Sequence, residues 1–163
     1  MKRDKRDYKR IVKELVEKSF VKLEKKIILV HGVNFQVSTA YASITYLGFM
    51  VWIVVFPFSK RCTLPEITSI LAHELSHYEL ILNMGFKEKL KFAFRWLFTK
   101  KGKAWFEMRA DQYAIEKGYA RGLYSRVFGI EKKSKNERLK TRLKKGYLSS
   151  KEIKEYAKKI GEW

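Results

Sequence analysis

The chain has 163 residues, of which 46% are apolar and 15% aromatic, and its formal net charge is +19. This apolar content excludes a disordered protein, and the single cysteine, Cys62, excludes an internal disulfide. The length fits a single domain over residues 1–163, and the charged N-terminus with the lone cysteine predicts a cytoplasmic protein without a signal peptide.

Lysine and arginine are spread along the whole chain, with 36 of them against 17 acidic residues. A solvated surface is the simplest interpretation of this charge. Attraction to nucleic acid or to an anionic surface is the alternative. Asn and Gln are rare among many Lys, Ile and Glu, which is typical of a thermophile.

The first predicted element is a helix over residues 7–25, because apolar residues recur there at helical spacing and charges occupy the other positions. Short strands are predicted near 27–31, 33–39, 41–47 and 49–56.

Residues 44–58 are nearly long enough to span a bilayer. Their content of Val, Ile and aromatic residues, and the breaks at Gly48 and Pro57, favour buried strands. A membrane helix at this place is the alternative.

The next helix is predicted over 64–84. Thr63 and Glu66 have the spacing of a capping box, Pro65 suits the first turn, and Gly85 is expected to end the helix in the left-handed conformation. The segment LAHELSH, residues 71–77, therefore lies in mid-helix.

Residues 87–101 are basic and aromatic, and they predict a helix that packs Phe92 and Trp96 inward. A segment at a membrane interface or a flap that grips a substrate is the alternative. A helix over 103–117 should precede Gly118. The tail, residues 131–163, predicts two short charged helices separated near Gly146, with a cap at Ser149 or Ser150.

His73 and His77 stand four residues apart in this predicted helix, so their rings share one face and can bind one zinc ion. Glu74 is turned about 100° from His73, where it can act as a general base without being a ligand. A zinc ion at this place would acidify water and polarise a scissile carbonyl, as peptide hydrolysis requires.

A third ligand has to come from elsewhere in the chain. His31 is the only other histidine, and it lies far upstream. Glu107 and Asp111 are the better candidates, because their spacing of four residues places two carboxylates on one helix face. Glu107 can bind the metal, while Asp111 can accept the remaining ring N–H of a ligand histidine. A solvated acidic pair is the alternative.

The motifs HELSH at 73–77 and EMRAD at 107–111 resemble those of gluzincin zinc metallopeptidases. The resemblance is greatest to the minigluzincins and to the soluble core of membrane-bound relatives that trim prenylated proteins. It implies an α+β fold with an N-terminal helix, a small twisted sheet of three to four strands, an active-site helix, a glutamate helix and a helical C-terminal tail. It also implies that His73, His77 and Glu107 are zinc ligands, that Glu74 is the general base, and that Asp111 supports a ligand.

Three further expectations follow from the resemblance. An edge strand within 48–57 would bind an extended protein or peptide substrate by strand addition. The tail, residues 131–163, could cover the cleft and keep the enzyme latent. Arg109, Tyr113 or Tyr119 would donate to the developing oxyanion, and the sequence does not choose among them.

The sequence therefore predicts a zinc-dependent endopeptidase. The alternatives are a zinc-containing binding protein without catalysis and a basic, nucleic-acid-associated protein on the same fold.

Overall fold

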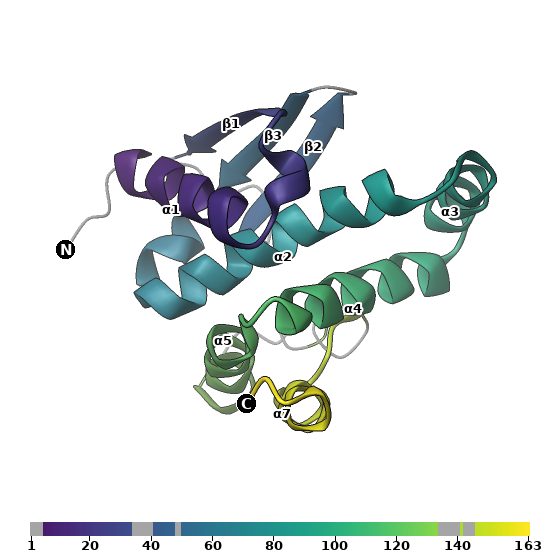
Figure 1. Cartoon of the computed structure of the whole chain (residues 1–163). Coiled ribbons are helices and arrows are strands. Elements are labelled where there is room, and N and C mark those ends of the chain that lie inside the picture. Colours follow the sequence, from purple (N-terminus) through teal and green to yellow (C-terminus); the bar gives the residue numbers. More distant parts are fainter. Residues whose placement is uncertain (1–4, 34–40, 48–49, 134–140, 142–145) are drawn as a thin grey trace.

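The computed structural model describes residues 5–33, 41–47, 50–133, 141 and 146–163. In this part of the chain, six α-helices and a three-stranded sheet form the expected α+β fold. The sheet and the first helix make one layer, one long helix lies beneath them, and further helices close the other side (Figure 1).

The N-terminal helix α1 (Lys5–Lys18) is shorter than predicted. It ends because the backbone N–H groups of both Ser19 and Phe20 donate to the carbonyl of Leu15, and a 3₁₀ turn (Val21–Leu23) follows. Phe20, at this break, is completely buried.

The sheet contains β1 (Ile27–Gly32), β2 (Ala42–Leu47) and β3 (Met50–Val55). Its order is β1-β3-β2, with β1 parallel and β2 antiparallel to β3. Three of the four predicted strands are thereby confirmed. The fourth, over 33–39, falls outside the described residues apart from its first position.

The expectation that the substrate-binding edge strand lies within 48–57 is wrong. β3 is the central strand, since its two neighbours pair with both of its sides. Its alternate residues Val51, Ile53 and Val55 are buried, so the most apolar strand occupies the middle of the sheet. A strand paired on both sides has no row of unpaired backbone groups to offer a peptide. Within the described residues, β2 is an edge strand that packs against the central helix.

The central helix α2 (Leu64–Asn83) begins with the predicted pairing of Thr63 and Glu66, in which the backbone N–H of Thr63 donates to Glu66 Oε2 at 2.7 Å. It is buried on nearly all sides, because it packs against α1 and β2 as well as against two later helices. Its end differs from the prediction. Gly85 has φ −67° rather than a left-handed conformation, and it caps the next helix instead.

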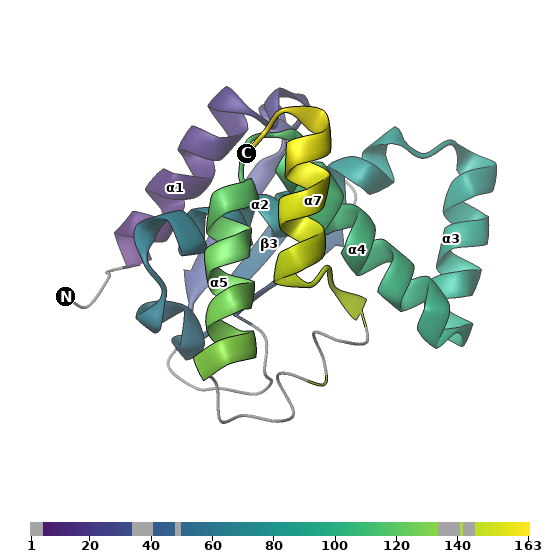
Figure 2. The same cartoon turned by 90° about the horizontal axis from the view of Figure 1, so that it is seen from below.

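The basic and aromatic segment forms α3 (Phe86–Phe98), which stands at one end of the molecule and packs mainly on α4 (Lys100–Glu116) (Figure 2). Phe92 faces inward as predicted, with its ring centroid 4.4 Å from that of Phe106. The prediction that Trp96 also packs inward is wrong, because this side chain is 43% exposed. Gly118 ends the region of α4 with φ +89°, a conformation that favours glycine.

A helix that the sequence did not predict, α5 (Ala120–Lys133), follows directly. It crosses α2 closely at Gly122, where a Cβ atom would lie 2.3 Å from the carbonyl oxygen of Pro65. The missing side chain at Gly122 therefore allows α5 to lie against α2.

The tail ends in α7 (Ser150–Ile160), which lies beside α5 (Figure 2) and also packs on α4. Ser149 is its cap, as predicted, and accepts a hydrogen bond from the backbone N–H of Glu152. Leu148, Ile153 and Ala157 are buried in the same hydrophobic cluster as α1, the sheet and α2. The described part of the tail is thus built into the core. The first predicted tail helix lies mostly outside the described residues.

The described residues of the apolar stretch 44–58 form strands and a 3₁₀ turn, as the composition favoured. Among the helices that the structure describes, none has the length and apolar content that a bilayer crossing requires.

Candidate metal centre

The two histidines of α2 point at one place. His73 and His77 are buried, their rings stand edge to face with centroids 4.6 Å apart, and their Nε2 atoms are 3.1 Å apart. One helical turn separates the residues, so the local geometry of α2 alone brings the two ring nitrogens together.

The third group comes from α4, which packs along α2 (Figure 1). Glu107 Oε2 lies 3.2 Å from His73 Nε2 and 3.4 Å from His77 Nε2. An ion with tetrahedral geometry and ligand distances of about 2.0–2.1 Å holds its donor atoms about 3.3 Å apart. The three side chains therefore form a group that can hold a metal ion, with two nitrogen donors and one oxygen donor.

Asp111 holds one of these rings in place. Its Oδ1 is 2.8 Å from His73 Nδ1, and its Oδ2 accepts a hydrogen bond from the backbone N–H of Leu148 at 3.1 Å. The carboxylate is completely buried. A carboxylate at this nitrogen favours the tautomer with the proton on Nδ1, which leaves the Nε2 lone pair of His73 facing Glu107.

His77 is positioned by packing. Its ring centroid lies 4.4 Å from that of Phe106, and Phe106 in turn contacts Phe92 of α3. Within the described residues its Nδ1 has no hydrogen-bond partner. The two histidines of the group are therefore oriented differently, one by a carboxylate and the other by an aromatic cluster.

The electrostatics of the group favour a positive charge between the rings and the carboxylate. Burial alone would lower the pKa of His73, but the charge and hydrogen bond of Asp111, together with Glu107, raise this pKa to about 10. Burial would raise the pKa of Glu107, yet its hydrogen bonds with His73 and His77 hold it well below the usual range. A divalent cation satisfies this arrangement, and a proton on a ring supplies the charge when no cation is bound.

Glu74 follows His73 in the chain and is also buried. Burial raises the pKa of its carboxyl group, while the charges of His73 and His77 oppose that rise. Glu74 is not part of the three-residue ligand group. It is a buried carboxyl group whose pKa responds to the charges of both histidines.

A residue that the sequence did not suggest is Arg126 of α5. Its side chain is 9% exposed, and its Nε has no hydrogen-bond partner in the part of the chain that the structure describes. Its positive charge makes a minor contribution that opposes the rise in the pKa of Glu74. Its guanidinium lies 5.7 Å from the ring centroid of Tyr41. No motif marks an arginine 52 residues after Glu74, and only the close crossing of α5 over α2 brings it near.

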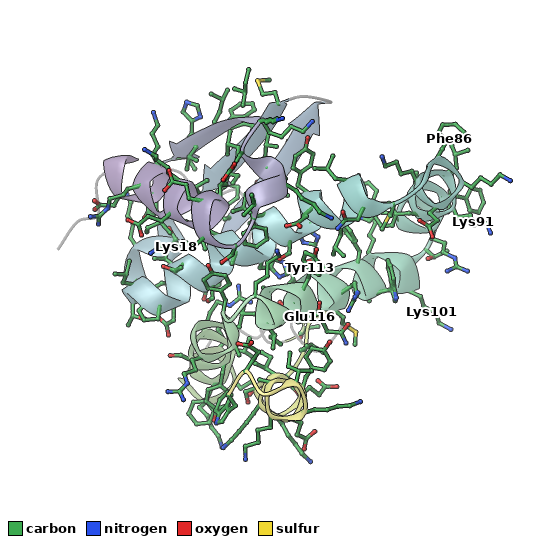
Figure 3. All side chains as sticks on the ribbon, viewed as in Figure 1. Lys18, Phe86, Lys91, Lys101, Tyr113 and Glu116 are labelled. Atoms are coloured by element: carbon green, nitrogen blue, oxygen red, sulfur yellow. The ribbon has the colours of Figure 1, made fainter. Side chains whose placement is uncertain are left out.

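The three residues considered as oxyanion donors have partners elsewhere. Arg109 donates to Gln112 and Glu116, each at 3.1 Å. The hydroxyl of Tyr113 donates to Glu79 at 3.2 Å, and Figure 3 shows Tyr113 between α2 and α4. The hydroxyl of Tyr119 is 2.8 Å from Ser19 Oγ. The structure does not join any of them to the three-residue ligand group.

His31 is also remote from this group. It lies on β1, and its Nδ1 accepts a hydrogen bond from the indole N–H of Trp52 at 3.0 Å. Both side chains are on the face of the sheet that is exposed. Of the candidates for a third metal-binding group, Glu107 is therefore the one that lies close to both His73 and His77.

The tail touches the centre directly. The ring centroid of Tyr147 lies 5.8 Å from that of His73. The backbone N–H of the next residue, Leu148, donates a hydrogen bond to Asp111. The contact follows from the burial of Leu148 in the core.

Comparison of the chain with models of protein families, with curated proteins and with solved structures finds no match. The function of the chain is therefore inferred from the chemistry of the centre itself.

Proposed function

We propose that the chain is a zinc-dependent endopeptidase. The observation that carries the proposal is the group of His73, His77 and Glu107, with the buried carboxyl of Glu74 beside it. Two imidazoles and one carboxylate are the protein ligands of many catalytic zinc sites, which keep a further position open.

Zinc in this group would activate water and polarise the scissile carbonyl. Glu74 accepts a proton at its carboxylate and delivers it to the leaving amine. Asp111 keeps the ring of His73 oriented throughout, and Phe106 does the same for His77 by contact.

The buried charge of Arg126 supports the role of Glu74. Burial raises the pKa of Glu74, and a general base has to be ionised before it can accept a proton. Arg126 is a positioning residue in this proposal, because it favours the ionised carboxyl without itself contacting the reacting atoms.

The decisive experiment replaces Glu74 by Gln and measures bound zinc together with cleavage of a denatured protein. Glu74→Gln should keep its zinc, because the three proposed ligands are unchanged. It should lose about 10²- to 10⁴-fold in cleavage rate, because the general base is removed. Glu14→Gln, at an exposed position of α1, is the matched control and should cleave like the wild type. Unchanged cleavage by Glu74→Gln would exclude this residue as the base.

A latent form of the same enzyme is favoured by the contact of Tyr147 with His73. Removal of the whole tail would not test it, because Leu148, Ile153 and Ala157 belong to the core. Tyr147→Ala is the appropriate variant, and it should raise cleavage without changing zinc content. A zinc-binding protein without catalysis would cleave nothing as wild type or as Tyr147→Ala.

A further inference from the structure

The outer side of α3 carries a row of exposed apolar side chains. The row consists of Phe86, Leu90, Phe94 and Phe98, which follow each other at intervals of four residues and are 58–77% exposed. The rings of Phe94 and Phe98 are in contact, with centroids 4.8 Å apart. Single exposed apolar residues are ordinary, but a continuous row indicates a surface that binds something.

This row is separate from the side of α3 that packs on the protein. On that side the ring of Phe92 contacts the ring of Phe106, with centroids 4.4 Å apart. The inward side therefore has its own partner, and Figure 3 shows Phe86 at the outer end of the molecule. The packing of α3 on α4 does not explain the outer row.

The same region is strongly basic. Residues 86–105 contain seven basic side chains and one acidic one. The acidic residue, Glu88, accepts a hydrogen bond from the backbone N–H of Gly85 at 2.9 Å. The basic residues are Lys87, Lys89, Lys91, Arg95, Lys100, Lys101 and Lys103.

A hollow of about 680 Å³ lies between α3 and α4. Phe92 and Trp105 give it apolar walls, while Lys91, Arg95 and Lys101 supply positive charge. Lys91 and Lys101 mark this end of the molecule in Figure 3. The hollow thus has the chemistry to accept an amphiphile with an anionic head.

We propose that the outer face of α3 binds an anionic lipid membrane surface. The apolar row would enter the headgroup region, and the surrounding lysines would lie among the lipid phosphates. The 13 residues of α3 span about 20 Å, which is too short to cross a bilayer and suits a helix in the plane of the interface.

The two other candidate partners each satisfy half of these observations. Nucleic acid would neutralise the lysines and leave the outer row of Phe and Leu in water. A second copy of the chain would cover the apolar row but would bring two sets of seven positive charges together. An anionic membrane provides both an apolar phase and negative charge.

The test is co-sedimentation of the full chain with vesicles of phosphatidylcholine, either alone or with about 30% phosphatidylglycerol. The wild type should bind the anionic vesicles and bind neutral vesicles weakly. Phe94→Ser/Phe98→Ser should weaken the anionic binding about tenfold or more, because it removes half of the apolar row. Val21→Ser/Leu64→Ser removes two exposed apolar residues at other places and should bind like the wild type.

Charge is tested separately with Lys89→Gln/Lys91→Gln, which should also weaken binding, and with Lys13→Gln/Lys151→Gln, which should weaken it less. The proposal is overturned if Phe94→Ser/Phe98→Ser and Val21→Ser/Leu64→Ser bind the anionic vesicles equally, since the net charge alone would then explain the attraction. Binding to duplex DNA with no binding to vesicles would overturn it in favour of nucleic acid. A dimer that the Phe94→Ser/Phe98→Ser variant abolishes, again without vesicle binding, would favour a second copy. No hydrolysis is measured, so this result does not depend on the proposed peptidase activity.

Discussion

Glu107 and His73 are 34 residues apart in the sequence, and Glu107 Oε2 lies 3.2 Å from His73 Nε2. The packing of α4 along α2 produces this approach. A carboxylate and an imidazole nitrogen at this distance, with the second histidine 3.4 Å from the same oxygen, leave space for one small cation among the three donor atoms.

Zinc content should depend on the ligand residues and not on histidine in general. We expect about one zinc per chain in the wild type and in His31→Ala, and none after purification of His77→Ala. Elemental analysis of the three proteins measures this. Full zinc content in His77→Ala would show that the ion binds at another place.

Asp111→Asn should reduce zinc affinity about 10- to 100-fold, because the ring of His73 loses the carboxylate that fixes its tautomer. Competition with a chelating dye gives the affinity. Asp7→Asn, in the first turn of α1, is the matched control and should bind zinc normally. Equal affinities in the two variants would mean that Asp111 serves the fold through Leu148 and not the metal.

The stability of the metal-free protein should depend on pH through His73. Its pKa is raised from 6.5 to about 10, so protonated His73 stabilises the folded state fully below pH 6.5. That contribution is lost as the pH rises through 10. In a chelator, the Tm advantage of the wild type over His73→Gln should therefore shrink between pH 6.5 and 10. An advantage that stays constant over this window would contradict the assignment.

Arg126→Met should move the acidic limb of the pH profile of kcat/KM to higher pH, because Glu74 loses a positive charge that favours its ionised form. Arg126→Lys keeps the charge and should restore most of the normal profile. Arg121→Met, at an exposed position of the same helix, is the control. A lower rate with an unshifted profile would indicate that Arg126 only supports packing.

Gly122→Ala should destabilise the fold by about 1–3 kcal/mol, because the added methyl group collides with the carbonyl of Pro65 and Ser69 Oγ. Gly129→Ala lies two turns further along α5, where a Cβ atom has open space. This second variant should be neutral or more stable by up to about 1 kcal/mol, as expected for alanine in a helix. Urea denaturation of both variants compares them directly.

The sequence alone determined what depends on neighbours within one element. His73 and His77 converge because a helix repeats every 3.6 residues, and the caps at Thr63 and Ser149 depend on hydrogen bonds over three residues. The strands are predictable because β-branched and aromatic residues are typical of pleated, buried segments.

Only the tertiary structure decided which elements lie together. It places Glu107, and not His31, beside the two histidines, and it places β3 in the centre of the sheet. It also brings Arg126 near Glu74 and leaves the outer row of α3 exposed to solvent. These outcomes depend on the packing of many side chains across α2, and features as small as the missing Cβ of Gly122 set how closely two helices approach. The periodicity of the sequence does not predict such distances, because they arise from contacts between residues far apart in the chain.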